Sequence, residues 1–386
     1  MRADMRNVRI DQIRGIAILL VLFHHFNIAY RLDDTSLAAA FGWVAVQAVA
    51  RNGNYGVTMF FVVSGYLITS NTLRRWGRLA NVNVWAFYGL RVARILPCLL
   101  LLLLCVDLLA LAGIEIFQNR ATGGISLWRV NLASLTFTMN VLIETYGWVN
   151  YPLGVLWSLS VEEVFYLTFP LLCLLLQRES RLCFFWAAII AIGPLYRWAH
   201  QGNEAGFLYA YFASFDAIAI GCGTAVLSRR LTLPVLTARL VQAMIAALMV
   251  FLYLAWPIAR SNVFGVIAIA LGTAVLLWPG QLSAPNTGAP GNPDTPLSRS
   301  SAVVAWCGMH SYELYLFHLI PLGGLRTWFP RTSVSGDEKL VLLAAFIALS
   351  LLLAAGVARC YAEPINRALR RRILRRRHRT TLSAPS

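Results

Sequence analysis

Apolar runs separated by short polar or basic segments recur along the whole chain. Eleven such runs are present, at residues 13–31, 55–70, 87–113, 131–143, 153–176, 182–199, 206–228, 236–257, 262–279, 302–322 and 340–359. About 20 predominantly apolar residues are the length of a helix that crosses the hydrocarbon core of a membrane. The pattern therefore predicts an all-α protein, a polytopic bundle of transmembrane helices.

The run at 131–143 differs from the others. It has only about two-thirds of the length that a spanning helix needs, and it is rich in Thr, Ser and Asn. A re-entrant or interfacial position for this run leaves about ten transmembrane helices. With both termini cytoplasmic, ten crossings place 24 of the 33 basic residues on the cytoplasmic side, as the positive-inside rule requires. An eleventh crossing would export the arginine-rich tail.

The composition agrees with a multi-pass membrane protein. The hydrophobic content is 58%, only 13% of residues are charged, and the mean hydropathy is +0.64, whereas about a quarter of the residues of a soluble protein are charged. The net charge of +16 lies on arginines between the apolar runs, so membrane topology explains it and no nucleic-acid partner is expected. The seven cysteines lack the close paired spacing of a zinc or redox site, so we expect neither metal nor disulfides.

Two polar stretches interrupt or end the apolar pattern. Residues 280–300, GQLSAPNTGAPGNPDTPLSRS, are predicted to form a flexible cytoplasmic linker inside an integral membrane domain of residues 1–363. Residues 364–386 form a basic cytoplasmic tail. This tail is either a solvated stop signal or an anchor on the headgroups of membrane lipids, and both interpretations are compatible.

The first apolar run, RIDQIRGIAILLVLFHHF, carries ionisable residues at both ends. On one helix Arg14 and His25 fall within roughly 20° of each other, with Asp11 nearby, and lie roughly 16 Å apart along the axis. They cannot touch, but they could serve one elongated ligand. The alternative is that Arg14 marks the cytoplasmic border and His25 is a satisfied polar group between helices. Ionisable residues inside a membrane favour a functional site.

The third run begins FYGLRVARILP and places Arg91 and Arg94 at i and i+3 on one helix face. Two guanidinium groups in this geometry suit phosphate oxygens, which they can bind bidentately. Ordinary positive charge at the cytoplasmic border is the alternative.

The fifth run, LGVLWSLSVEEVFYLTFPLL, contains two adjacent carboxylates, Glu162 and Glu163. Such a pair is costly in a bilayer unless an arginine or histidine accompanies it, so it is either a structural ion pair or part of a catalytic site. Asp216, Glu313 and His318 are further titratable residues in apolar surroundings.

Taken together, these stretches resemble the acyltransferase-3 family of integral membrane acyltransferases. The resemblance covers nearly the whole chain. It depends on the order and spacing of the Asp11-to-His25 stretch, of GVTMFFVVSGYLI, of Arg91 with Arg94, of WSLSVEEVFY and of SYELYLFH.

The resemblance implies an O-acyltransferase in the inner membrane, with a ten-helix bundle. The expected donor is acyl-CoA, first of all acetyl-CoA, and the expected acceptor is a hydroxyl of a surface polysaccharide or lipid-linked glycan. His25 would be the catalytic histidine, and Arg91 and Arg94 would be needed for activity. The recurring glutamate of the family aligns with Glu162 rather than Glu163. Neutral imidazole suits a general base that removes the hydroxyl proton, with Arg14 serving the same ligand.

One possible partner and two alternative functions remain open at this point. Some members of the family carry an extra hydrolase-like domain; we expect its step to occur here within the bundle or in a partner of the polysaccharide biosynthesis machinery. A transporter or flippase of an anionic or glycan-bearing lipid would also explain buried charges, but not the spacing of Arg14 and His25. A purely structural component of an export complex would leave those charges unexplained.

Overall fold

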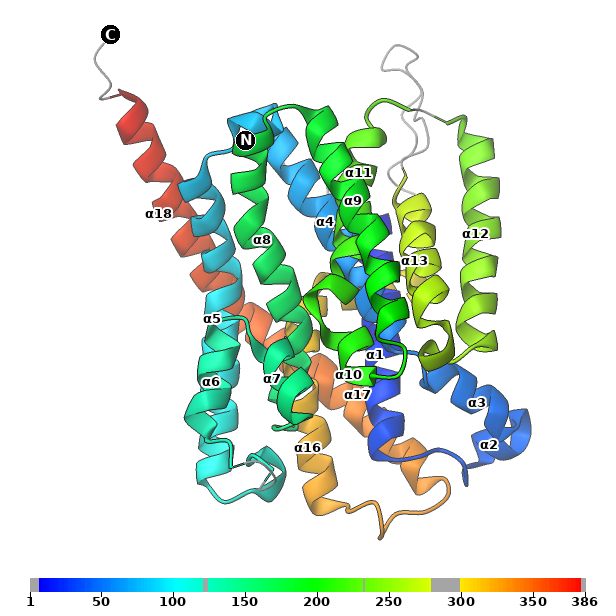
Figure 1. The fold of residues 1–386 in the computed structure, drawn as a ribbon. Coiled ribbons are helices and arrows are strands. Elements are labelled where there is room, and N and C mark those ends of the chain that lie inside the picture. Colours follow the sequence, from blue (N-terminus) through cyan, green and yellow to red (C-terminus); the bar gives the residue numbers. More distant parts are fainter. Residues whose placement is uncertain (1–6, 121–123, 232, 279–298, 383–386) are drawn as a thin grey trace. The chain divides into compact units, whose positions relative to one another are not determined.

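The computed structural model describes residues 7–120, 124–231, 233–278 and 299–382 (Figure 1). Within these ranges the chain forms helices and no β-strand; a single isolated bridge joins Asn119 and Asn150. The predicted all-α class is therefore confirmed. Nearly all of the expected linker, residues 280–298, lies outside the described residues.

Eight helical stretches of the described residues are long and apolar enough to cross a membrane: Val8–Ala29, Trp43–Trp76, Val84–Leu111, Leu153–Leu176, Glu179–Ala199, Val235–Ala255, Ile258–Leu277 and Glu338–Ile373. As predicted, the run at 131–143 forms no helix of spanning length. The two remaining runs, 206–228 and 302–322, are each divided into short helices. The protein is thus a multi-pass membrane protein in which two predicted spans are interrupted.

The chain divides into two compact units, and the first comprises residues 1–71 and 183–311. Its helices are α1 (Val8–Ala29), α2 (Ser36–Phe41), α3 (Trp43–Ala50), α4 (Asn54–Trp76, which continues into the second unit), α9 (Glu179–Ala199), α10 (Glu204–Tyr209), α11 (Phe215–Leu227), α12 (Val235–Ala255), α13 (Ile258–Leu277) and α14 (Arg299–Met309). A short 3-10 turn, Tyr211–Ala213, precedes α11.

Glycines let pairs of helices in the first unit touch backbone to backbone. A Cβ atom at Gly15 of α1 would lie 1.9 Å from the carbonyl oxygen of Val304 on α14, so no other residue fits there. Gly65 of α4 approaches α11 equally closely, because a Cβ atom there would lie 1.9 Å from the Ile218 oxygen. Small residues at such crossings are typical of membrane helices. The close packing fixes α1, which carries Arg14 and His25, against α14.

The turn before α4 is held by one side chain. Asn52 donates to the carbonyl oxygens of Tyr253 at 2.5 Å and Trp256 at 2.9 Å, and it accepts from the backbone nitrogen of Ile258 at 2.9 Å. These groups lie where α12 ends and α13 begins, so Asn52 satisfies helix termini that would otherwise be left unpaired.

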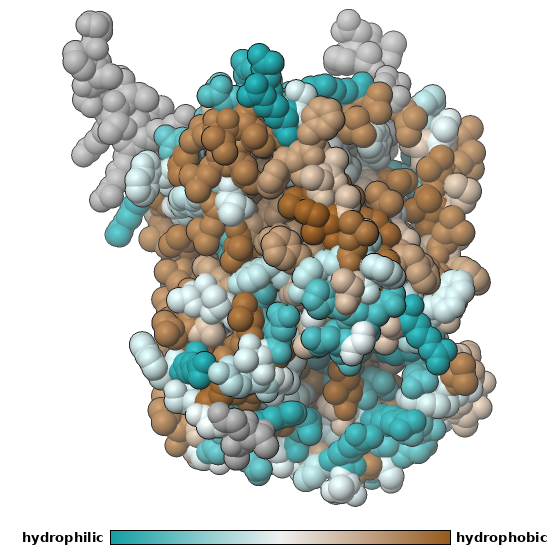
Figure 2. All heavy atoms as spheres, in the orientation of Figure 1, coloured by the Kyte–Doolittle hydropathy of each residue, from teal (hydrophilic) through white to brown (hydrophobic). Residues whose placement is uncertain are grey.

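Helix α12 lies alongside α13 in the first unit (Figure 1) and exposes apolar side chains along its length, among them Leu236, Leu240, Met244, Leu248 and Phe251. The hydrophobic surface over α12 is visible at the right of Figure 2. An apolar surface of this length suits contact with lipid chains.

The second unit comprises residues 72–182 and 312–386. Its helices are α5 (Val84–Leu111), α6 (Leu127–Leu135), α7 (Met139–Tyr146), α8 (Leu156–Leu176), α15 (Ser311–Phe317), α16 (Leu319–Trp328), α17 (Glu338–Val357) and α18 (Glu363–Leu382). A π-helical turn, Ala358–Ala362, joins α17 to α18. Three 3-10 turns complete the unit: Leu79–Asn81, Glu115–Phe117 and Leu153–Val155.

Helices α5 and α8 are joined by aromatic contacts. The rings of Phe87 and Phe169 stack with their centres 5.8 Å apart, and the Tyr88 hydroxyl donates to the Leu167 carbonyl oxygen at 2.5 Å. These contacts fix the register of the two helices that carry the arginine pair and the carboxylate pair.

Candidate functional site

The site residues predicted from the sequence fall into two groups. Arg14 and His25 belong to α1 of the first unit, whereas Arg91, Arg94 and Glu162 belong to α5 and α8 of the second. Each group is described within its own unit.

His25 lies near the C-terminal end of α1 and is half-buried. Its Nδ1 atom is 3.0 Å from the carbonyl oxygen of Val21, one turn earlier in the helix. A carbonyl oxygen only accepts hydrogen bonds, so Nδ1 carries the proton and the lone pair of the neutral ring is on Nε2. This tautomer is the one in which Nε2 can receive a proton.

His24, the neighbouring residue, is held by different groups. Its Nδ1 atom is 2.7 Å from the carbonyl oxygen of Ala50 at the end of α3. A Cβ atom at Gly53 would lie 2.3 Å from the Cβ atom of His24, so the α3–α4 turn packs directly on this histidine. His24 therefore acts in packing, and its ring meets that of His25 edge-on at 5.6 Å.

Arg14 is half-buried and precedes Gly15, the residue in backbone contact with α14. Helix α1 is continuous from Val8 to Ala29, so Arg14 and His25 keep the separation of roughly 16 Å that helical geometry gives them. Neighbouring Gln12 donates to the Ser301 hydroxyl of α14 at 2.6 Å. The rotation of α1 is therefore fixed near Arg14.

In the second unit the arginine pair and the carboxylate pair meet through Tyr166. The guanidinium carbon of Arg91 is 3.9 Å from the centre of the Tyr166 ring, and the Tyr166 hydroxyl donates to Glu162 Oε1 at 2.5 Å. The charges of Arg91 and Arg94 both act on Glu163. We refer to Arg91, Arg94, Glu162, Glu163 and Tyr166 as the arginine–glutamate cluster.

The two carboxylates of this cluster have different surroundings. Glu162 is half-buried, and its Oε1 atom accepts from a tyrosine on the same helix. Glu163 is only 6% exposed, and its Oε1 atom has no hydrogen-bond partner within the part of the chain that the structure describes. Burying a carboxylate in this way is costly without nearby positive charge. The positive charges of Arg91 and Arg94 offset part of this cost, and burial remains the larger effect on Glu163.

Helix α15 adds residues to the same region of the second unit. The Tyr312 hydroxyl donates to the Ile95 carbonyl oxygen on α5 at 3.0 Å, and the Ser158 hydroxyl of α8 donates to the Tyr315 hydroxyl at 2.8 Å. His318 is buried and its Nδ1 atom lies 2.8 Å from the Tyr315 carbonyl oxygen, at the break between α15 and α16. These contacts favour a packing role for His318.

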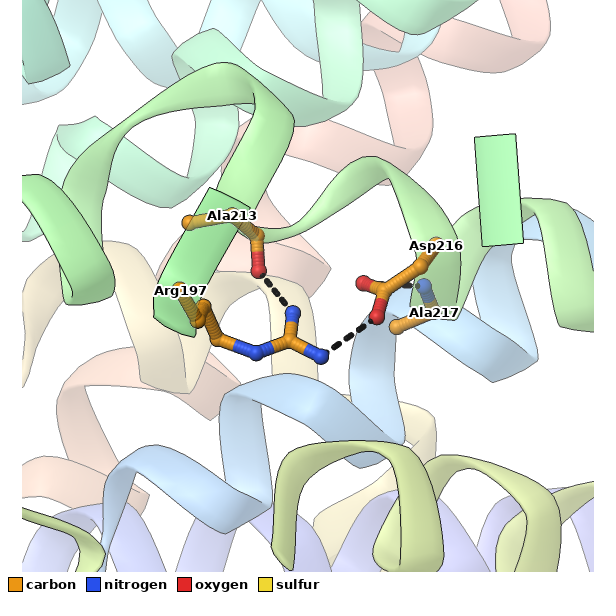
Figure 3. Close-up of polar contacts among 4 residues, drawn as sticks. All are labelled: Arg197, Ala213, Asp216 and Ala217. Carbon is orange, nitrogen blue, oxygen red and sulfur yellow. Dashed lines mark hydrogen bonds and ion pairs between the residues drawn. The ribbon is translucent and has the colours of Figure 1, made fainter. Parts of the chain in front are cut away.

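Sequence reasoning missed Arg197. This residue forms an ion pair with Asp216 in the first unit, at 2.7 Å between Nη2 and Oδ2, with both side chains 0% exposed (Figure 3). Arg197 also donates to the Ala213 carbonyl oxygen at 2.5 Å, and Asp216 accepts from the backbone nitrogen of Ala217 at 2.9 Å. The sequence had singled out Asp216 in its apolar surroundings, but it gave no indication that Arg197, at the end of the apolar run 182–199, was its partner.

The ion pair of Arg197 and Asp216 fits only because α9 has a glycine beside the Asp216 carboxyl group. A Cβ atom at Gly193, one turn before Arg197, would lie 2.4 Å from the Asp216 carboxyl group. The pair thereby ties the end of α9 to the interrupted backbone before α11.

The chemistry that these groups allow is proton transfer and the binding of anionic groups. His25 presents Nε2 as a base, and Arg91 and Arg94 are suited to phosphate oxygens. Among the described residues, no group of three or more His, Cys, Asp or Glu side chains could hold a metal ion.

A multi-pass helix bundle with these ionisable groups is an integral membrane protein with charged side chains among its helices. The family described as an acyltransferase domain, acyltransferase-3, matches residues 7–360. The chain therefore belongs to the acyltransferase-3 family, as its sequence resemblance predicted.

Two curated relatives illustrate the similarity. The peptidoglycan O-acetyltransferase OatA of Listeria monocytogenes is 30% identical over 163 residues, which cover 42% of this chain and 23% of that protein. The O-acetyltransferase OatA of Staphylococcus aureus is 29% identical over 178 residues, which cover 45% of this chain and 25% of that protein. The matched region thus spans about a quarter of the length of these relatives. No solved structure matches the chain.

Proposed function

We propose that this protein is an O-acyltransferase that moves an acyl group, first of all acetyl, from acyl-CoA to a hydroxyl of a surface polysaccharide or lipid-linked glycan. The observation that carries the proposal is the 3.0 Å contact between His25 Nδ1 and the Val21 carbonyl oxygen, inside the segment that matches an acyltransferase family. Because a carbonyl oxygen only accepts, we infer that the lone pair of the neutral ring is on Nε2. The names of the two relatives, both O-acetyltransferases, support the acetyl group, and the name of the Listeria protein, a peptidoglycan O-acetyltransferase, supports a glycan acceptor.

The proposed reaction is a simple exchange of bonds. An alcohol is a poor nucleophile until its proton is leaving, and a neutral imidazole removes that proton at physiological pH. The acceptor oxygen attacks the thioester carbonyl carbon while His25 Nε2 takes the hydroxyl proton. The carbon–sulfur bond then breaks, an ester forms, and the proton passes from His25 to the departing CoA thiolate.

Each of the other predicted site residues has a proposed role. Arg91 and Arg94 bind phosphate groups of the donor, and Arg14 binds another polar part of the ligand that His25 serves. Glu162, whose Oε1 atom accepts a hydrogen bond from the Tyr166 hydroxyl, is a further proposed catalytic residue. Glu163 is buried, and the charges of Arg91 and Arg94 act on it. A test of the catalytic role of Glu162 therefore compares substitutions of the two glutamates.

We also infer the cellular setting from the charge pattern. Residues 1–363 act as the membrane acyltransferase domain and residues 364–386 as a basic tail, with both termini in the cytoplasm and the protein in the inner membrane. Polysaccharide biosynthesis machinery supplies the acceptor. A fluorescent cytoplasmic reporter fused after Ser386 should be active; an active periplasmic alkaline phosphatase fusion there would contradict the orientation.

The direct test of the activity uses the purified protein in lipid vesicles. With acetyl-CoA and a glycan acceptor, we expect release of the CoA thiol together with alkali-labile acetyl ester on the glycan. Movement of lipid-linked glycan across the vesicle membrane, with no release of CoA thiol, would contradict the proposal and identify a transporter or flippase.

A further inference from the structure

The outward face of α5 marks the depth of the membrane in the second unit. Exposed apolar side chains follow each other along one stripe of this helix: Val92, Leu96, Leu100, Leu104, Leu108 and Leu111. At about 1.5 Å per residue this stripe is about 28 Å long, close to the thickness of a hydrocarbon core. One border of the hydrocarbon therefore lies near Val92.

The residues that precede this border have the character of the interface. Trp85 is 86% exposed and lies in the first turn of α5, about 10 Å before Val92 along the helix axis. Exposed tryptophan is typical of the headgroup level of a membrane. The first turns of α5 thus lie among lipid headgroups.

Helix α18 packs against this part of α5 (Figure 1). A Cβ atom at Gly89 would lie 3.3 Å from Cδ1 of Ile373, so the two helices touch closely at this position. Gly89 is about 4.5 Å before Val92 along α5. The contact places Ile373 at the membrane border.

Helix α18 has two faces. Ile365, Leu369 and Ile373 recur every fourth residue and are half-buried, whereas Arg370, Arg371 and Arg372 are exposed. Arg367 is paired with Glu363. The three arginines at 370–372 have no ion-pair partner among the side chains that the structure describes, and they lie within one helical turn of Ile373.

We propose that Arg370, Arg371 and Arg372 form a binding surface for the phosphate headgroups of anionic phospholipids at this border of the membrane. The α5 contact holds the three guanidinium groups at headgroup depth, where arginine can bind phosphate oxygens bidentately. Each basic residue near an anionic membrane surface contributes measurably to the attraction. A nucleic acid is the less suitable ligand, because it would have to reach these arginines at the level of the lipid headgroups.

The test counts lipids bound to the full-length protein by native mass spectrometry. The protein in neutral detergent is titrated with phosphatidylglycerol or with phosphatidylcholine, at low salt and at about 0.5 M salt. The higher salt concentration screens exposed charges. We expect phosphatidylglycerol to be retained at lower concentration than phosphatidylcholine, with the preference reduced at high salt. Equal retention of the two lipids in the unmodified protein would overturn the proposal.

Variants locate the surface. Arg370→Gln/Arg371→Gln/Arg372→Gln should weaken retention of phosphatidylglycerol by about tenfold or more, and the corresponding triple lysine variant should restore most of it. The matched control, Arg229→Gln/Arg230→Gln/Arg239→Gln, removes the same charge from the first unit and should leave retention within about twofold. An equal loss in the control, or competition by an oligonucleotide as effective as phosphatidylglycerol, would assign the effect to general charge or to nucleic acid and refute the proposal.

Discussion

The guanidinium carbon of Arg91 on α5 lies 3.9 Å from the centre of the Tyr166 ring on α8. A cation in this position is attracted to the face of the ring, and the planar guanidinium group is held in one orientation. The same tyrosine donates its hydroxyl hydrogen to Glu162. One aromatic side chain therefore orients both a proposed donor-binding cation and a proposed catalytic carboxylate.

Two substitutions separate these functions of Tyr166. Tyr166→Phe keeps the ring beneath Arg91, so we expect the affinity for acetyl-CoA to stay within about threefold, with turnover reduced because Glu162 loses its hydrogen bond. Tyr166→Leu removes the ring as well and should weaken donor affinity by about 2- to 30-fold. Calorimetric titration of each purified variant with acetyl-CoA measures the difference. Equal donor affinity for the two variants would show that the ring does not orient Arg91.

The arginine pair gives a second prediction. Arg91→Ala and Arg94→Ala should each weaken acetyl-CoA binding by roughly ten- to a hundredfold, because each removes a charge-assisted contact worth about 1.5–3 kcal/mol. The control is Arg178→Ala/Arg181→Ala, which removes two arginines with the same spacing, both exposed, whereas Arg91 is half-buried and Arg94 exposed. If the control weakens binding as much as the site variants, the pair serves membrane topology and not the donor.

The adjacent carboxylates give the third prediction. Glu162→Gln should keep expression, thermal stability and donor affinity, but lower turnover by about 10² or more, on the scale of lost general-base support. Glu163→Gln should keep turnover within about tenfold but change the melting temperature. The reason is that Glu163 is the buried glutamate of the two and the charges of Arg91 and Arg94 act on it. Both quantities are measured on the same purified preparations. The reverse pattern would transfer the catalytic role to Glu163.

The buried ion pair of the first unit gives the fourth prediction. Asp216→Asn leaves the charge of Arg197 buried, so it should cost about 3–5 kcal/mol of stability. Arg197→Met/Asp216→Leu removes both charges and should be less harmful than the single change. Asp33→Asn is the control, because it breaks the ion pair of Arg31 and Asp33, whose side chains are 50% and 38% exposed, at a cost of about 0–1 kcal/mol. Similar melting temperatures for Asp216→Asn and Asp33→Asn would contradict the structural role of the buried pair.

The sequence predicted the helical class and the short run at 131–143, because hydropathy and length report directly on spanning helices. It did not predict the breaks within 206–228 and 302–322, which fall at residues 210–214, at His310 and at His318, because the hydropathy of a whole run reports its length and not a local interruption. The partner of Asp216 was also out of reach, since Arg197 lies 19 residues away on another helix.

The candidate site was also predictable only in part, because contacts between helices far apart in the sequence cannot be read from its pattern. Residue types and spacing single out Arg91, Arg94 and Glu162, but the link through Tyr166 depends on the register of α5 against α8, which no periodicity reveals. The spacing from Arg14 singled out His25 over His24, but the carbonyl partners of the two rings, Ala50 for His24 and Val21 for His25, became visible only in the structure.

The central claim is that His25 is the base of an acyl transfer, and His24 provides a control on the adjacent position. The decisive measurement is the rate at which labelled acetyl from acetyl-CoA becomes alkali-labile ester on glycan, in vesicles containing the purified protein, His25→Asn or His24→Asn. We expect His25→Asn to be slower by about 10²–10⁴ at unchanged donor affinity, and His24→Asn to stay within about tenfold. A folded His25→Asn protein that transfers acetyl as fast as the unmodified protein would contradict the account.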